Sequence, residues 1–288
     1  MNYRHAYHAG NFADVVKHAV LCRALFHLRQ KPAAFRVIDS HAGAGVYDLA
    51  GPEAGKTGEW RNGIGRLLGD QAEPLPEQAR ALLAPYLDAV AALNPSGKLA
   101  VYPGSPALVQ AMLRRQDRLI ACELEPNAAA ALARRLHGDP RAKALAIDGW
   151  TALGATVPPK ERRGLVLIDP PFEQPDEISR LAKGLQAAHR KWPAGGYLLW
   201  YPVKDTAEVT SFVRKLSRLG IGKMLRVELI VATASEDLGL RGSGLIAVNP
   251  PWTLHEELKV LLPALATTLG RGGKTALTLD WLTGETSR

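Results

Sequence analysis

The stretch that decides the fold is RGLVLIDPPF, residues 163–172. Its apolar run, Leu165 to Ile168, is typical of a parallel strand that is buried on both faces. Ligands of open α/β sheets bind at the carboxyl ends of such strands, so Asp169 is predicted to lie where chemistry takes place. Pro170 and Pro171 lack an N–H group and cannot extend the strand, which leaves their carbonyl groups free to accept hydrogen bonds from a ligand.

The groups that follow this strand fit an amino group on a flat ring. The carboxylate of Asp169 and the carbonyl of Pro170 can each accept one proton of an exocyclic NH2, and Phe172 offers a face on which the base can stack. The simpler interpretation is a strand that ends in a Pro-rich turn.

Two other predicted strands also end in a carboxylate. RLIACE ends in Glu123 and AKALAID ends in Asp148, while the first predicted strand, residues 36–39, runs into a turn that contains Gly43 and Gly45. Glycines in such a turn let the backbone approach a ligand closely. Three acids behind a glycine turn predict an α/β sheet with a ligand site along its carboxyl edge. The alternative interpretation is that Glu123 and Asp148 only cap the turns that follow them.

The rest of the chain supplies helices around this sheet. Residues 11–30 predict an amphipathic helix with Asn11 as its N-cap, and Ser105 is expected to cap the helix that begins at Pro106. Residues from about 46 to 102 are punctuated by Gly and Pro and are interpreted as a small helical insertion after the first strand. We therefore expect one domain over residues 1–288, with an N-terminal arm and helix over 1–30.

A second Pro-Pro motif, NPPW, begins at Asn249. Its strand follows the strand from Met224 to Ala232 through a short loop without a crossover helix, so the two are predicted to form an antiparallel hairpin. Asn249 is then expected at the edge of the sheet opposite Asp169, where NPPW serves as a structural stop before the next helix.

Composition points to an intracellular protein with a polyanionic partner. The chain has 36 Lys and Arg against 28 Asp and Glu, a formal net charge of +8 and a pI near 9.6, which favours nucleic acid. Its two cysteines lie in apolar patterns, and neither a signal peptide nor a spanning segment is recognisable. We expect a soluble cytoplasmic protein.

The assembled pattern resembles the S-adenosylmethionine-dependent methyltransferases, whose [DN]PP[YF] motif acts on amino groups. That resemblance implies a Rossmann-like fold with a mostly parallel sheet and one antiparallel strand. The run YRHAYHAGNFADVVKH, residues 3–18, also resembles the start of the RlmJ-type 23S ribosomal RNA adenine-N6 methyltransferases. The likeness continues through DSHAGAG, TGEW, YPGSP, CELEP and LWYPV and covers nearly the whole chain. Phe172 stands where the family often has tyrosine, which keeps the stacking face.

The resemblance implies roles for particular residues. S-adenosylmethionine would be the cofactor, with Glu123 accepting its ribose hydroxyls and Asp148 its adenine amino group. Asp169 would be the catalytic acid, assisted by Pro170 and Phe172, and Tyr3, Arg4 and His5 would contact the substrate. The full set of implied cofactor contacts, including the glycines of the turn, is Lys17, His18, His41, Gly43, Gly45, Ser105, Glu123, Asp148 and Gly149. The implied partner is 23S ribosomal RNA, bound by a monomer without metal or membrane.

Three other functions remain open. A guanine amino group could replace adenine, because DPPF serves both bases, and a non-catalytic RNA-binding protein would share the charge. A nicotinamide-dependent oxidoreductase is disfavoured, since HAGAG lacks the third spaced glycine. Metal binding by the N-terminal histidines is also disfavoured, because His18 and His27 are expected on opposite sides of one helix. The loop from Thr233 to Gly244 leaves substrate detail undetermined.

Overall fold

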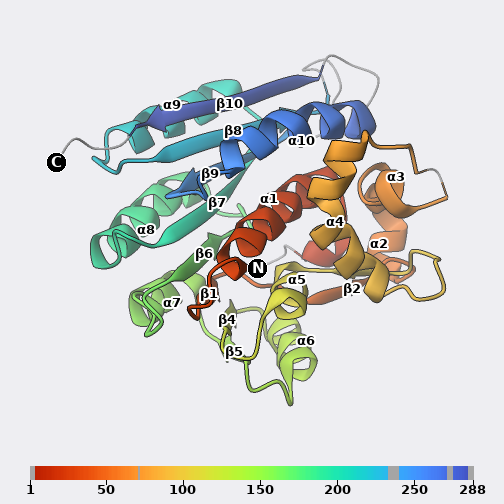
Figure 1. The fold of residues 1–288 in the computed structure, drawn as a ribbon, viewed down its shortest axis with the longest axis horizontal. Helices are drawn as coiled ribbons and strands as arrows, with labels where there is room; N and C mark the ends of the chain where they lie inside the picture. The colour runs from red at the N-terminus through yellow and green to blue at the C-terminus, as the bar shows by residue number, and fades with distance from the viewer. Residues whose placement is uncertain (1–3, 71, 233–239, 271–274, 285–288) are drawn as a thin grey trace.

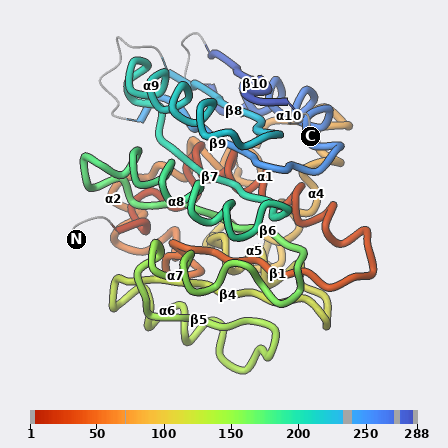
Figure 2. Tube along the Cα trace, turned by 90° about the vertical axis from the view of Figure 1, so that its left-hand side faces the viewer, coloured from red at the N-terminus to blue at the C-terminus, as the bar shows by residue number. Residues whose placement is uncertain are grey.

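The computed structural model describes residues 4–70, 72–232, 240–270 and 275–284 (Figure 1). Its centre is an eight-stranded sheet, whose strands follow one another from top to bottom in Figure 2. In order across the sheet they are β10 (Ala276–Thr283), β8 (Met224–Ile230), β9 (Gly242–Val248), β7 (Gly196–Val203), β6 (Gly164–Ile168), β1 (Arg36–Asp39), β4 (Arg118–Glu123) and β5 (Ala142–Ala146).

Five neighbouring strands, β7, β6, β1, β4 and β5, are parallel. All residues of β6 are buried, as expected for a strand covered by helices on both faces. Because side chains alternate along a strand, Leu165 and Leu167 pack into the core on one face, while Val166 and Ile168 pack into the core on the other. The predicted α/β architecture is confirmed, and the carboxyl ends of the parallel strands meet at one edge.

The other half of the sheet differs from the prediction in one respect. β9 pairs antiparallel with both β7 and β8, which confirms the predicted hairpin. However, β10 pairs antiparallel with β8, so two strands rather than one run against the others. The sequence analysis missed β10 because it is a half-exposed edge strand, with Leu277 and Trp281 exposed, and lacks the continuous apolar run of a buried strand.

Helices cover both faces of the sheet. One core joins the sheet to α1 (Phe12–Arg29), α5 (Ser105–Met112) and α10 (Leu254–Leu269), and the other joins it to α8 (Glu177–Lys191) and α9 (Thr206–Ser217). The remaining helical elements are η1 (His5–Tyr7), α2 (Pro52–Thr57), η2 (Glu59–Asn62), α3 (Gly65–Leu68), α4 (Glu77–Ala92), α6 (Pro126–Leu136) and α7 (Gly149–Thr156). Among the described residues, no helix is both long and apolar enough to cross a membrane.

Helix α1 is more deeply buried than its pattern suggested. Asn11 is its N-cap, as predicted, and accepts a hydrogen bond from the backbone N–H of Asp14. The expectation of an amphipathic helix was wrong, because every residue from Phe12 to Leu25 is buried, including Asp14, Lys17, His18 and Arg23. The physical reason is that α1 packs on β9 and is covered by α4, α5 and α10 (Figure 1).

The segment after β1 leaves the sheet and returns to it. β2 (Val46–Asp48) pairs antiparallel with β3 (Val101–Pro103), and α2, η2, α3 and α4 lie between them in the chain. The paired strands close the base of this helical segment, whose ends coincide with those of the predicted insertion. Tyr102 of β3 reaches into the core beneath α1, where its hydroxyl bonds to His18.

Candidate active site

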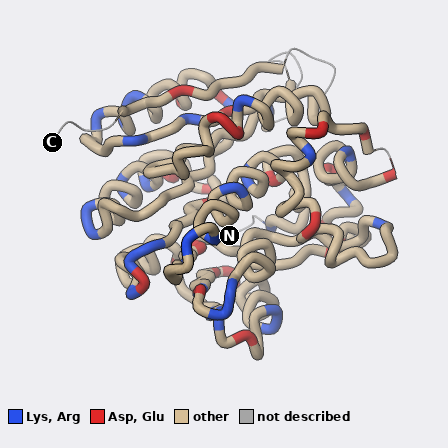
Figure 3. Tube along the Cα trace, viewed as in Figure 1, with Lys and Arg blue, Asp and Glu red and all other residues tan. Residues whose placement is uncertain are grey.

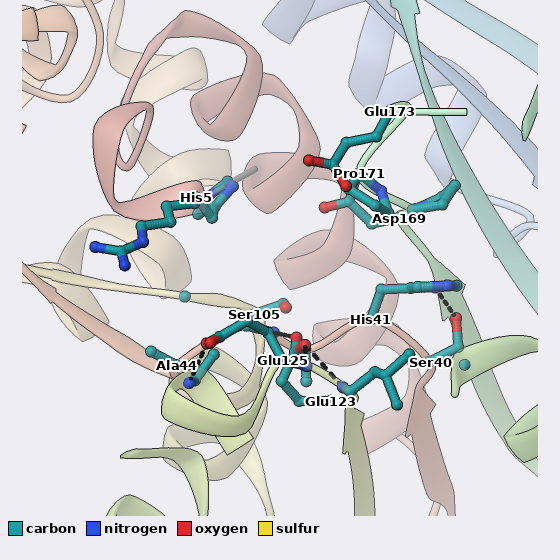
Figure 4. A pocket seen from close by; sticks show the side chains of 18 of the residues that line it. His5, Ser40, His41, Ala44, Ser105, Glu123, Glu125, Asp169, Pro171 and Glu173 are labelled. Atoms are coloured by element: carbon teal, nitrogen blue, oxygen red, sulfur yellow. Dashed lines mark hydrogen bonds between the residues drawn. The ribbon is translucent and has the colours of Figure 1, made fainter. Parts of the chain in front are cut away.

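The carboxyl ends of β1, β4, β5 and β6 surround a cavity of about 540 Å³. Figure 4 shows Asp169 and Pro171 on one side of it, with His5 opposite and with Glu123 and Ser105 farther along the wall. All but one of the predicted cofactor residues line this cavity: Lys17, His18, His41, Gly43, Ser105, Glu123, Asp148 and Gly149. Gly45 does not line it. A side chain at Gly45 would instead meet Leu132 and Arg135 of α6.

Glu123 and Asp148 both fix local backbone while they line the cavity. Glu123 accepts hydrogen bonds from the backbone N–H groups of Gly43, Leu124 and Glu125, each at 2.8 Å. Asp148 is the N-cap of α7, and its Oδ2 accepts from Thr151 N at 2.8 Å. Both acids therefore bind the backbone of the turns that follow them, as the capping alternative predicted. Each carboxylate oxygen can accept more than one hydrogen bond, so both acids keep capacity for a ligand.

His41 and Gly149 approach each other closely at the turn after β1. A Cβ atom on Gly149 would come within 2.6 Å of the His41 ring and 2.2 Å of the Ser40 carbonyl, so only glycine fits there. His41 Nδ1 lies 2.8 Å from Ser40 Oγ, and the ring packs edge-on against Trp150. Burial lowers the pKa of His41 to about 4. The imidazole is therefore neutral at pH 7 and presents a polar, uncharged wall to the cavity.

Lys17 joins α1 to the segment that follows β6. Its Nζ lies 2.8 Å from Asp14 Oδ1 and 2.5 Å from Asp169 Oδ2, and its side chain is only 5% exposed. Burial alone would lower the pKa of Lys17, but the carboxylates of Asp14 and Asp169 outweigh burial and raise the pKa above its ordinary range. Lys17 is therefore a permanent cation that fixes the position of Asp169.

The N-terminal arm reaches the same ion-pair network. His5 Nε2 lies 3.0 Å from Asp14 Oδ2, which also accepts from the backbone N–H of Gly10. Arg4 lines the cavity and lies 3.5 Å from Glu53. Tyr3, predicted to contact the substrate, lies outside the described residues. His18 lines the cavity but is 1% exposed, and burial lowers its pKa to about 3.

The sequence analysis missed Asp39, which ends β1 between Glu123 and Asp169. Ser105 Oγ donates to Asp39 Oδ2 at 2.7 Å. Helix α5 begins at Ser105 with Gly104 as its N-cap, so the predicted capping role of Ser105 was wrong. The hydroxyl is turned toward Asp39 instead. Burial, with repulsion from Asp169, raises the pKa of Asp39 to about 7. A lone acid at the end of a four-residue strand gave no signal of this environment.

A second cavity, of about 600 Å³, lies on the other side of the Lys17–Asp169 ion pair. It shares His5, Lys17, Asp169 and Pro171 with the first cavity, so these residues form a common wall. Aromatic rings line its interior: Phe172 packs edge-on against Trp200 with ring centroids 5.4 Å apart. Trp200 was also missed, although its place near the end of the strand beside β6 could have revealed it.

The histidines of the N-terminal region lie in separate places. Among the residues that the structure describes, no group of three or more His, Cys, Asp or Glu side chains is placed to hold a metal ion. His8 Nδ1 lies 3.0 Å from Glu59, and His18 Nδ1 lies 2.7 Å from the Tyr102 hydroxyl. The histidines of the N-terminal region are thus used singly, in separate contacts.

The sheet order and the site at its carboxyl edge define a Rossmann-like methyltransferase fold. The family model described as "ribosomal RNA large subunit methyltransferase D, RlmJ" matches residues 32–283. A protein of Haemophilus influenzae named ribosomal RNA large subunit methyltransferase J is 40% identical, over 99% of this chain and all of its own length. Its namesake from Escherichia coli is 38% identical with the same coverage. The chain belongs to the RlmJ family.

A solved structure agrees with this assignment. A protein from Legionella pneumophila superimposes with a TM-score of 0.86 at 33% identity, over 95% of this chain and 98% of its own. The match extends over nearly the whole chain, so it includes the helical segment between β2 and β3 as well as the sheet.

Proposed function

We propose that this protein transfers a methyl group from S-adenosylmethionine to the N6 amino group of an adenine in 23S ribosomal RNA. The observation that carries the proposal is the common wall of the two cavities. Asp169 and Lys17 line both, so a methyl donor in one cavity and an acceptor base in the other meet at Asp169. The curated relatives, which are named as large-subunit ribosomal RNA methyltransferases, support this reading. We further propose that residues 1–288 act as one methyltransferase domain.

The first cavity suits S-adenosylmethionine, which supplies an electrophilic methyl group when bound. Glu123 is placed to accept the ribose hydroxyls, as strand-end acids do in related folds. Asp148 would accept a hydrogen bond from the adenine amino group, and neutral His41 and Gly149 would lie near the ring. Ser105 and the glycine turn at Gly43 complete the wall.

The second cavity suits a base that has left its stack. Phe172 and Trp200 offer aromatic surface on which the base can stack. This stacking offsets part of the cost of removing the base from its helix, which is roughly a few kcal/mol. Asp169 and the carbonyl of Pro170 then each accept a hydrogen bond from one N–H of the amino group. This arrangement favours a pyramidal nitrogen and stabilises the positive charge that grows on it during transfer.

Lys17 has a positioning role in this scheme. By holding Asp169 Oδ2 it fixes one carboxylate oxygen and leaves Oδ1 to face the amine. Asp169 need not be a strong base, because the methylated ammonium is far more acidic than the amine and releases its proton to the carboxylate or to water.

Radioactive methyl transfer tests the proposal. Protein, methyl-labelled S-adenosylmethionine and transcribed 23S ribosomal RNA are incubated together, and the RNA is digested to nucleosides. We expect label in N6-methyladenosine. Label in N2-methylguanosine would establish the guanine alternative, and RNA binding without incorporation of label would establish a non-catalytic protein.

A further inference from the structure

The edge of the sheet opposite Asp169 carries a concentration of basic side chains. Three segments lie there, at the amino ends of β1, β4 and β6: residues 26–36, 114–118 and 159–163. Together they contain nine Lys and Arg and two acids, Asp117 and Glu161. Their net charge is therefore +7, and that of the whole chain is +8. Lys and Arg elsewhere are spread over many elements (Figure 3). We call these three segments the far-edge face.

The three segments are bonded into one surface. The backbone N–H of Arg36 donates to Arg163 O at 2.9 Å, and that of Arg118 donates to Phe35 O at 3.0 Å. The guanidinium groups of Arg114 and Arg163 both donate to the carbonyl of Ala33, at 3.1 and 3.0 Å. Burial and the nearby Arg114 lower the pKa of Arg163. The fold therefore holds two guanidinium groups beside each other.

Neither acid of this face neutralises its exposed cations. Asp117 pairs with Arg114 at 2.8 Å, and Glu161 pairs with Arg36 at 2.8 Å. Five exposed side chains remain, and within the described part of the chain they make no ion pair: Arg29, Lys31, Arg115, Lys160 and Arg162. The fold does not require them, and their mutual repulsion opposes folding. A bound polyanion would relieve that repulsion.

An exposed aromatic ring stands on the same edge. Trp252, of the NPPW motif, is 84% exposed. Asn249 of that motif bonds to the carbonyls of Pro193 and Gly195, just before β7. Asn249 follows β9, and β7 lies between β9 and β6, so Asn249 lies two strand spacings, about 10 Å, from the β6 end of the far-edge face. An exposed indole face near this edge suits an unpaired base.

We propose that the far-edge face is a second RNA-binding surface, which holds phosphates of the substrate away from the target base. The proposal rests on the proposed function, because it takes RNA to be the substrate. Lys17 is at the active site and Arg29 is twelve residues farther along α1, which corresponds to about 18 Å. Only an RNA that extends over that distance can contact both places, so the surface favours a substrate longer than the target nucleotide alone.

Charge reversal tests the proposal without touching either cavity. Arg115→Glu with Arg162→Glu removes two exposed cations of the face. Lys98→Glu with Lys183→Glu changes the net charge equally at two exposed positions outside the face. For the first variant we expect KM for 23S ribosomal RNA to rise about tenfold with kcat unchanged, and the slope of log K against log salt to fall by about two. The control should match the wild type.

The outcomes separate cleanly. Equal KM and equal salt slopes in the two double variants, with melting temperatures like the wild type, would overturn the proposal. Trp252→Ala should weaken RNA binding about fivefold to a hundredfold without changing the slope, and an unchanged affinity would exclude stacking there. If the wild type transferred no methyl group to RNA, the proposed function would fail, whereas the binding comparison would still decide this surface.

Discussion

The two Pro-Pro motifs, DPPF at Asp169 and NPPW at Asn249, are alike in sequence and opposite in place. Each follows a buried strand, and each includes a residue with positive φ, Phe172 at 52° and Asn249 at 47°. β6 runs with the parallel set, whereas β9 runs against it. Asp169 therefore reaches the edge that carries both cavities, and Asn249 reaches the edge that carries none of the predicted cofactor residues. Strand direction, more than the motif, decides which one lies at the site.

Asp169→Ala should give the largest effect on activity. It removes the acceptor that positions the amine, so we expect methyl transfer to fall by about 10³-fold, comparable to the loss of a preorganised transition-state contact. Binding of S-adenosylhomocysteine should persist, because Glu123 and Asp148 are intact. Calorimetric titration and single-turnover rates measure both. An active Asp169→Ala variant would show that DPPF is not the catalytic motif.

Lys17→Met should reduce both activity and stability. It leaves Asp14 and Asp169 without their shared cation, and breaking a buried ion pair costs about 3–5 kcal/mol. Denaturant unfolding gives the free energy, and Lys17→Arg serves as the control that keeps the charge. A methionine variant with normal stability would show that the ion pair does not hold Asp169 in place.

Asn249→Ala should lower stability and spare catalysis. The side chain donates to Pro193 O and Gly195 O, both at 2.8 Å, and the residue adopts a positive φ that alanine disfavours. We expect a loss of about 1–3 kcal/mol in the free energy of unfolding. Asn249→Gly relieves the backbone part only. A folded alanine variant without methyl transfer would contradict the structural role of NPPW.

Asp39→Asn should change how stability depends on pH. Burial raises the pKa of Asp39 to about 7 in the folded protein, above its value of about 3.9 in an unfolded chain. The folded state therefore binds the proton of Asp39 more tightly than the unfolded chain does. The stability that this proton contributes to the wild type is fully present at low pH and is lost between about pH 4 and 7. The variant should gain stability relative to wild type across that window. A constant difference in melting temperature from pH 4 to 8 would exclude this titration.

Local sequence was sufficient for the strand that carries Asp169. Its apolar run and its two prolines act within ten residues, and the Asn11 cap is equally local. The burial of α1 could not be predicted in this way, because α4 and α10 cover it from far along the chain. The same holds for the contact between Lys17 and Asp169, which are 152 residues apart.

The sequence pattern also could not predict the electrostatic environment of Asp39. The raised pKa of Asp39 depends on its burial and on the nearby charge of Asp169, which together outweigh the hydrogen bond from Ser105. β10 was missed for a different reason, since none of its residues is buried and it lacks the continuous apolar run of a core strand. Resemblance to the family brought in Lys17 and His18, which the residues alone had not marked, but it did not separate Gly45 from the glycine that lines the cavity.

The most direct test of the account is a crystal structure with S-adenosylhomocysteine, the demethylated product of the cofactor. We expect the ligand in the 540 Å³ cavity, with its ribose at Glu123 and its sulfur directed toward Asp169 and the second cavity. Density for the ligand outside this cavity, or a sulfur directed away from Asp169, would contradict the assignment of DPPF as the catalytic motif.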